Sequence, residues 1–168
     1  MKWQAMAAAA LVLSLGATEG RGEDAAVAPP AGARLLLSAG ADGVQIYACE
    51  AQGEGFAWVF KAPEAALFDA QGRQIGKHFA GPSWQAPDGS AVVGEAVAKA
   101  DAPQGGAVPW LLLRAKSHSG EGEFAPVAFI RRIDTKGGLA PAAGCDAAHR
   151  GAEARMRYSA SYLFYAAP

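Results

Sequence analysis

The sequence is poor in charge and has no basic cluster. Only 18% of its 168 residues are charged, and 15 Lys and Arg against 16 Asp and Glu leave a formal net charge of -1. Proteins that bind nucleic acid draw much of their affinity from clustered Lys and Arg on phosphates, and a polybasic membrane-binding patch needs the same clustering. We therefore expect no nucleic-acid partner and no electrostatic membrane patch.

Motifs of common enzyme classes are also missing. Ser90 follows Gly89 but is followed by Ala91 and Val92, so the chain has no Gly-x-Ser-x-Gly elbow of a serine hydrolase. No stretch keeps helical periodicity for three turns, which removes the strand-turn-helix context of a dinucleotide-binding glycine loop. We expect no cofactor, and the sequence assigns no catalytic residue.

Long hydrophobic runs are lacking as well. The N-terminal apolar stretch from Ala5 to Leu15 follows Lys2 and precedes a polar run, and it is about half the ~20 residues that a membrane-spanning helix needs. This layout predicts a cleavable signal peptide over residues 1–22, with a short signal anchor as the alternative. The mature protein is then periplasmic or extracellular, without a membrane span.

The predicted mature chain divides into two parts. Residues 23–33 are expected to be a linker that buries nothing, because Ala25 to Ala33 are Ala, Pro and Gly with one Val. Residues 34–168 are long enough for one hydrophobic core and too short for two ordinary domains. The sequence therefore predicts a single domain.

Cysteine is scarce, and both copies lie in that domain. In an oxidising compartment, the even count and wide separation of Cys49 and Cys145 predict a disulfide. Closing such a loop removes unfolded-chain entropy on the order of 4 to 5 kcal/mol. The alternative, two thiolates sharing a metal with His149, falls short of a closed zinc ligand set, and no metal site is predicted.

Short apolar runs separated by Gly, Asp, Pro and Ser clusters fill the rest of the chain. This spacing predicts an all-β domain, a sandwich or partly closed barrel of about eight to ten strands. Val44, Ile46 and Ala48 form an apolar face of one strand, opposite the face that carries Cys49. Phe56, Trp58 and Phe60 share a face of the next strand and are expected to anchor the core. Trp84, between Pro82 and Pro87, is expected at the surface.

Several motifs are specific enough to indicate a family. They include Gly43-Val44-Gln45-Ile46-Tyr47-x-Cys49, Gly76-x-His78-x-Ala80-Gly81-Pro82-x-Trp84, Asp88-Gly89-Ser90 and Pro109-Trp110-Leu111-Leu112-Leu113. Through these motifs the chain resembles, from Ala33 onward, an uncharacterised family of exported bacterial and fungal proteins classed as a domain of unknown function. The resemblance implies no established activity, substrate or cofactor. One departure from the family pattern is Arg131 in place of glutamine, which we expect to alter only the surface.

The candidate ligand-binding residues are His78, Trp84, Asp69 and Asp88. An imidazole with two carboxylates and an indole could form a general base with its orienting group, a metal site, or a platform for carbohydrate. Each also has a structural interpretation. Asp69 and Asp88 precede turn glycines, where carboxylates bind backbone amides, and His78 could be a hydrogen-bonded residue at a sheet edge.

Three hypotheses for function follow. The favoured one is an exported, non-catalytic module that binds a small molecule or a cell-envelope polymer, with His78 and Trp84 in the site. The second is a hydrolytic or metal-dependent enzyme that uses His78 with Asp69 and Asp88. The third is a structural envelope or stress protein whose contribution is its stability.

Overall fold

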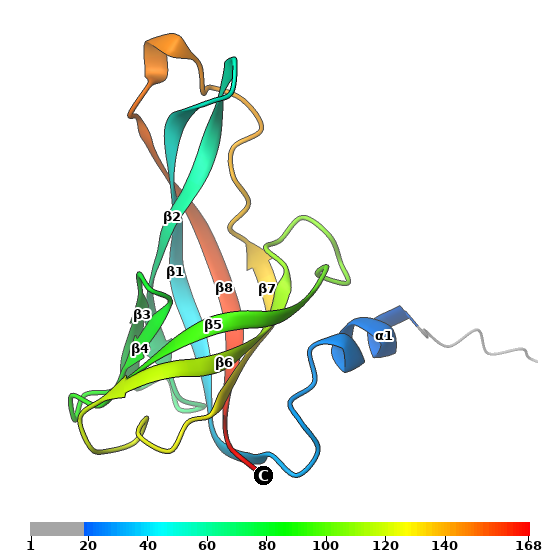
Figure 1. Cartoon of the computed structure of the whole chain (residues 1–168), viewed down its shortest axis with the longest axis vertical. Coiled ribbons are helices and arrows are strands. Elements are labelled where there is room, and N and C mark those ends of the chain that lie inside the picture. The colour runs from blue at the N-terminus through cyan, green and yellow to red at the C-terminus, as the bar shows by residue number, and fades with distance from the viewer. Residues whose placement is uncertain (1–18) are drawn as a thin grey trace, which may run out of the picture.

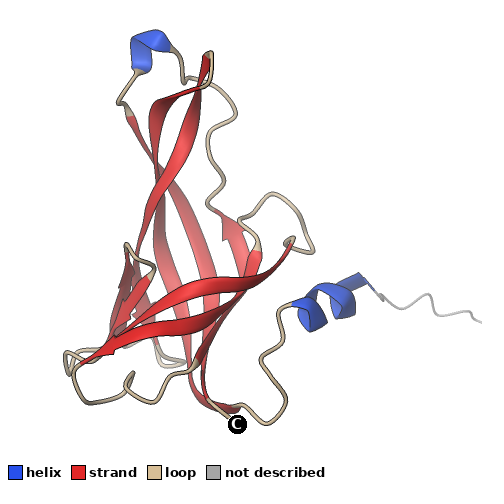
Figure 2. Ribbon diagram, in the orientation of Figure 1, coloured by secondary structure: helices blue, strands red, loops and turns tan. Residues whose placement is uncertain are grey.

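The computed structural model describes residues 19–168, which form one closed barrel of antiparallel strands with a short N-terminal helix (Figures 1 and 2). The elements in chain order are α1 (Glu19–Ala26), β1 (Arg34–Gln52), β2 (Gly55–Phe68), β3 (Gln74–Phe79), β4 (Ser83–Gln85), β5 (Ala91–Ala100), β6 (Trp110–Ser119), β7 (Phe129–Gly137), the 3-10 helix η1 (Ala147–His149) and β8 (Glu153–Ala166). Each strand pairs with the next, and β8 pairs with β1 to close the sheet. The all-β prediction is confirmed, and the architecture is a barrel of eight strands.

The charged and apolar segments of the predicted signal peptide lie in residues 1–18, outside the described residues. No helix within residues 19–168 has both the length and the apolar character needed to cross a membrane.

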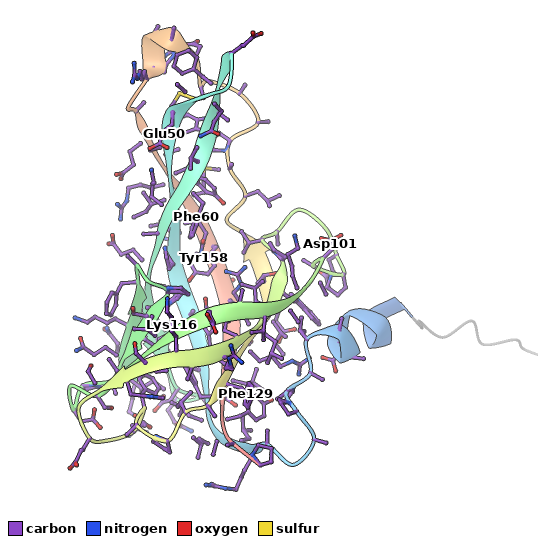
Figure 3. All side chains as sticks on the ribbon, in the orientation of Figure 1. Glu50, Phe60, Asp101, Lys116, Phe129 and Tyr158 are labelled. Carbon is purple, nitrogen blue, oxygen red and sulfur yellow. A yellow bond between two sulfur atoms is a disulfide. The ribbon has the colours of Figure 1, made fainter. Side chains whose placement is uncertain are left out.

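The barrel is uneven because β1, β2 and β8 are much longer than β3 and β4. The far halves of β1 and β2 project beyond the barrel as a twisted hairpin, along which Glu50 and Phe60 lie (Figure 3). The predicted disulfide is present there. Cys49 on β1 bonds Cys145 in the loop after β7, with their Cα atoms 5.3 Å apart, so this bond fastens the long loop to the projecting hairpin.

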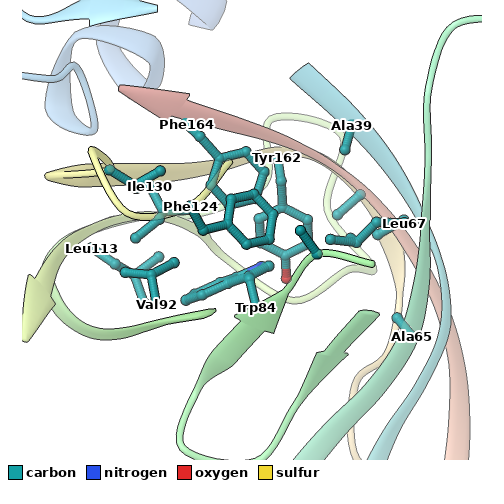
Figure 4. Close-up of a cluster of buried hydrophobic side chains, with 14 of the residues drawn as sticks. Ala39, Ala65, Leu67, Trp84, Val92, Leu113, Phe124, Ile130, Tyr162 and Phe164 are labelled. Atoms are coloured by element: carbon teal, nitrogen blue, oxygen red, sulfur yellow. The ribbon is translucent and has the colours of Figure 1, made fainter. Parts of the chain in front are cut away.

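The hydrophobic core fills one part of the barrel. Large side chains from most strands meet there, including Leu67, Trp84, Val92, Leu113, Ile130, Tyr162 and Phe164, together with Phe124 from the loop before β7 (Figure 4). The Phe124 and Phe164 rings stack with centroids 4.8 Å apart. Burial of these aromatic side chains is the main source of stability for a barrel of this size.

One expected core face is wrong, and a second apolar face is less buried than the face opposite it. On β1, Gln45, Tyr47 and Cys49 are buried, whereas Val44, Ile46 and Ala48 are only partly buried. On β2, Phe60 is 50% exposed, because this part of the strand belongs to the projecting hairpin rather than to the barrel. Strict alternation is equally compatible with either face, so the pattern could not decide which one closes inward.

The segment expected as a linker contributes to a second apolar cluster. Val27 is fully buried and packs with Ala102, Trp110 and Leu112 on the outside of the barrel, contrary to the expectation that this stretch buries nothing. Arg131 donates from Nε to the Val27 carbonyl oxygen at 2.8 Å and ion-pairs with Asp24. Arg131 is therefore buried, and the expectation that it alters only the surface is wrong.

Candidate functional site

A cavity of about 380 Å³ opens into the barrel beside the aromatic core. Its wall is formed by side chains from β1 to β8, namely Gln45, Pro63, His78, Trp84, Leu111, Leu113, Arg132 and Tyr162. The more exposed residues at its rim are Phe60, Lys61, Gly81 and Ala96. Its size lies at the lower end of the range typical of small-molecule sites, about 300 to 1,000 Å³.

One wall of the cavity is a stacked pair of rings. His78 on β3 and Trp84 on β4 are direct cross-strand partners, and their ring centroids are 4.4 Å apart with planes inclined by 10°. The structure therefore brings together two of the four candidate residues. Trp84 is only 1% exposed, so the expectation of a surface tryptophan is wrong. The flanking prolines end a three-residue strand that faces inward, rather than a solvent loop.

His78 is held neutral by its surroundings. The ring is 3% exposed, and Nδ1 lies 2.8 Å from the Ser83 carbonyl oxygen, which can only accept, so Nδ1 carries the proton. Burial, aided by the positive charge of Arg132, lowers the pKa of His78 to about 3. The lone pair of the neutral ring is consequently on Nε2, which can accept a hydrogen bond.

The opposite wall is a row across three strands. Leu111 on β6 is the register partner of Arg132 on β7, which is in turn the partner of Tyr162 on β8. Arg132 is buried and donates from Nε and Nη2 to the Pro109 carbonyl oxygen at 3.1 and 2.8 Å. These bonds fix the guanidinium in the cavity wall. Figure 4 shows the Tyr162 ring reaching from β8 toward the Trp84 indole, and their centroids are 5.5 Å apart.

Two buried donors on the wall lack a partner. Nε2 of Gln45 and Nε1 of Trp84 are shielded from solvent and form no hydrogen bond with any of the described residues. Gln45 itself is 2% exposed. A buried donor without an acceptor costs about 1–3 kcal/mol, so proteins seldom leave one unsatisfied. Here both unsatisfied donors belong to residues of the same cavity.

The other two candidates lie in turns. Asp69, after β2, accepts from the backbone N–H groups of Gln71 and Arg73, both at 2.9 Å, and from Arg73 Nε at 2.7 Å. Asp88, before β5, accepts from Ser90 N–H at 2.8 Å and from Glu123 N–H at 2.9 Å. These hydrogen bonds lower the pKa of both carboxyl groups. Neither carboxylate lines the cavity or bonds to His78.

Within the described part of the chain, no group of three or more His, Cys, Asp and Glu side chains is placed to hold a metal ion. His149, which the sequence offered as a third ligand, is exposed and bonds through Nδ1 to Asp146 Oδ1 at 2.7 Å. Asp146 caps η1 by accepting from the backbone amides of Ala148 and His149. This cluster is therefore a helix cap.

Sequence reasoning missed the other residues of the cavity wall, among them three with polar groups: Gln45, Arg132 and Tyr162. Gln45 shares a strand face with Tyr47 and Cys49, and the aliphatic residues on the other face of that strand gave the sequence no reason to select it. Arg132 alternates with the fully buried Ile130, but a basic residue in a strand is usually solvent-exposed, so the pattern alone gave no reason to select it.

A family model described as a protein of unknown function (DUF3455) matches residues 30–166, which include the whole barrel. The chain belongs to the DUF3455 family. The resemblance to an uncharacterised family, drawn from the motifs, is thereby confirmed. No curated protein and no solved structure matched the chain. The function of this DUF3455 domain must therefore be argued from its own site.

Proposed function

We propose that this protein is an exported, non-catalytic module that binds a small molecule, or the end of a cell-envelope polymer, inside the barrel. The observation that carries the proposal is the cavity, whose wall combines apolar side chains with the buried polar side chains of Gln45, His78 and Arg132. A bound molecule would place its apolar part against the indole and the neighbouring leucines and its polar atoms toward the polar side chains of the wall.

Export is supported by the N-terminal pattern and by the disulfide. Structural disulfides persist in the periplasm and outside the cell and are rare in the reducing cytosol. The bond between Cys49 and Cys145 closes a loop with a sequence separation of 96 residues. A protein that depends on such a bond is suited to an oxidising compartment.

The geometry gives less support to an enzyme. A general base works best with a pKa near the operating pH, but burial lowers the pKa of His78 to about 3. The carboxylates of Asp69 and Asp88 are engaged by turn amides and cannot orient the imidazole. His78 is better suited to accept a hydrogen bond from a ligand than to remove a proton from a substrate.

A purely structural role also fits less well. Small barrels that act only as scaffolds fill their interior with side chains, since an empty space forfeits packing contacts. In this barrel Arg132 and Gln45, both polar, occupy inward positions beside an open cavity. Their placement favours a site shaped for a molecule from outside the chain.

The test is a binding panel on two variants, one with a larger side chain at the cavity and one with the same substitution elsewhere. Ala96→Leu adds bulk at the exposed rim, and Ala51→Leu makes the same change on the exposed end of β1, away from the cavity. Small metabolites and glycan fragments would be screened by thermal shift and confirmed by calorimetry. We expect a compound that binds the wild type and Ala51→Leu, with at least tenfold weaker binding to Ala96→Leu. Equal binding to all three proteins, or no binding by any compound, would overturn the proposal.

A further inference from the structure

The polar groups of the cavity form an unbalanced set. Arg132 carries a permanent positive charge, and Gln45 Nε2 and Trp84 Nε1 are unsatisfied donors. No Asp or Glu is among the residues that line this cavity. The charged side chains of the lining, Arg132 and Lys61, are both cationic. The wall therefore favours a ligand that carries acceptor atoms.

Arg132 has no anionic partner in the part of the chain that the structure describes. Within residues 19–168 it forms no ion pair, and its two hydrogen bonds go to the neutral carbonyl of Pro109. A buried charge is costly unless it is paired, and buried arginines are normally matched to carboxylates. The neighbouring Arg131, which points to the other face of β7, follows that rule by pairing with Asp24. The unpaired guanidinium of Arg132 is therefore the exception on this strand.

The positive charge of Arg132 changes the pKa values of residues on two other strands of the cavity wall. It lowers the pKa of His78 on β3 and opposes the burial that raises the pKa of Tyr162 on β8. Both residues are members of the cavity wall, so the guanidinium acts on the interior rather than on solvent. The other cation at the site, Lys61 on the rim, is exposed and already ion-paired with Glu50.

We propose that the cavity binds a small organic anion, with its charged group against Arg132 and its apolar body against Trp84, Leu111 and Leu113. This inference rests on the proposed function, and it assigns the chemical class of the ligand. Carboxylates and phosphate monoesters share this chemistry, because both accept from a guanidinium in a planar, charge-assisted arrangement.

Calorimetry with four probes of similar size tests the charge preference directly. The probes are phenylacetate, phenyl phosphate, the neutral phenylacetamide and the cationic phenethylamine. We expect one of the two anions to bind the wild-type protein at least tenfold more tightly than phenylacetamide, and phenethylamine to bind most weakly. The stronger of the two anions identifies the preferred acid group.

Variants assign the preference to Arg132. Arg132→Met removes the charge and should abolish the tenfold advantage of the anion, and Arg132→Lys should restore part of it. Arg157→Met makes the same change at an exposed arginine that pairs with Asp42 outside the cavity lining. It is the matched control and should change anion affinity by less than about threefold. If Arg132→Met does not fold, the wild-type comparison of acid with amide still decides the question.

The two proposals fail in different ways. If phenylacetamide binds as tightly as phenylacetate and Ala96→Leu weakens both, the cavity is a binding site but the anionic ligand is wrong. If the anions bind equally well to the wild type and to Ala96→Leu, they bind elsewhere, and both proposals are contradicted. If no probe binds the wild type, the anionic assignment is overturned, and the wider panel above decides the binding role.

Discussion

The imidazole of His78 lies flat on the indole of Trp84, with 4.4 Å between ring centroids and only 10° between the ring planes. The two residues face each other across β3 and β4, and Tyr162 meets both rings edge-on. The backbone bond from His78 Nδ1 to the Ser83 carbonyl fixes the orientation of the imidazole. The stack forms a preorganised wall for the cavity, which reduces the entropy lost on binding.

Burial of His78 makes the fold sensitive to acid. Because the pKa of His78 is about 3 in the folded chain and near 6.5 when it is unfolded, the unfolded state binds this proton more readily between those values. The contribution of His78 is retained above pH 6.5 and declines as the pH falls toward 3, by up to about 1.4 kcal/mol per pH unit. Urea denaturation at pH 7, 6, 5 and 4 should show this slope.

The variant His78→Phe keeps a ring at this position but cannot take up a proton. Asp69, Asp88, Glu95 and Asp146, whose pKa values are also lowered, titrate equally in both proteins and cancel in the comparison. We expect a shallower dependence of unfolding free energy on pH for His78→Phe. Parallel curves for the two proteins would show that His78 is not held neutral by burial.

Gly43 permits a close approach of β1 to β2. A methyl group there would overlap the Glu64 carbonyl oxygen and the Ala65 backbone, which cannot move without breaking the strand pair. Gly43→Ala should lower the free energy of unfolding by about 1–3 kcal/mol or more. Gly40 lies on the same strand, and a methyl group there meets nothing nearer than the Phe68 carbonyl oxygen at 4.0 Å. Gly40→Ala is therefore the control, and equal losses in chemical denaturation would refute the steric explanation.

The disulfide should contribute strongly to stability. Its loop, with a sequence separation of 96 residues, accounts for about 4–5 kcal/mol of unfolded-chain entropy in the simple model. Reduction should lower the thermal midpoint of the wild type and have no effect on the double variant Cys49→Ala/Cys145→Ala. A wild-type midpoint that does not respond to reductant would show that the bond is dispensable.

Asp88 anchors the turn before β5 and is not among the residues that line the cavity. Its carboxylate accepts from Ser90 N–H and Oγ and from Glu123 N–H, which ties two loops together. Asp88→Ala should lower the thermal midpoint while leaving the affinity of any cavity ligand within about twofold, since turn and cavity are separate features. A selective loss of ligand affinity in a folded Asp88→Ala protein would revive the second hypothesis from the sequence, an enzyme.

Much of the architecture could be predicted because turn residues determine the chain direction over a few positions, and the only two cysteines of the sequence can pair only with each other. Gly, Pro and Asp clusters mark the ends of the strands. The disulfide between Cys49 and Cys145 was predicted from an oxidising compartment and the even number of cysteines. His78 and Trp84 were found together because they lie in one short motif that becomes a single hairpin. The turn role weighed for Asp69 and Asp88 likewise depends on residues a few positions away.

The rest of the site was not predictable because it is assembled across the barrel. Gln45, Arg132 and Tyr162 come from strands far apart in the sequence, and their convergence depends on which pleat face of each strand closes inward. On β1 the more buried face carries Gln45, Tyr47 and Cys49, although the aliphatic residues lie on the other face. Only the closed topology distinguishes these two choices.

The claim that the cavity is the binding site is tested most directly by the indole N–H resonances in NMR spectra. Trp84 Nε1 has no partner among the described residues, whereas Trp58 Nε1 on the projecting hairpin donates to the Ala143 carbonyl oxygen at 2.9 Å. On titration with a ligand that binds the protein, the Trp84 indole signal should shift and saturate with the calorimetric affinity, while the Trp58 signal stays in place. A ligand that saturates the protein without moving the Trp84 signal would contradict the account.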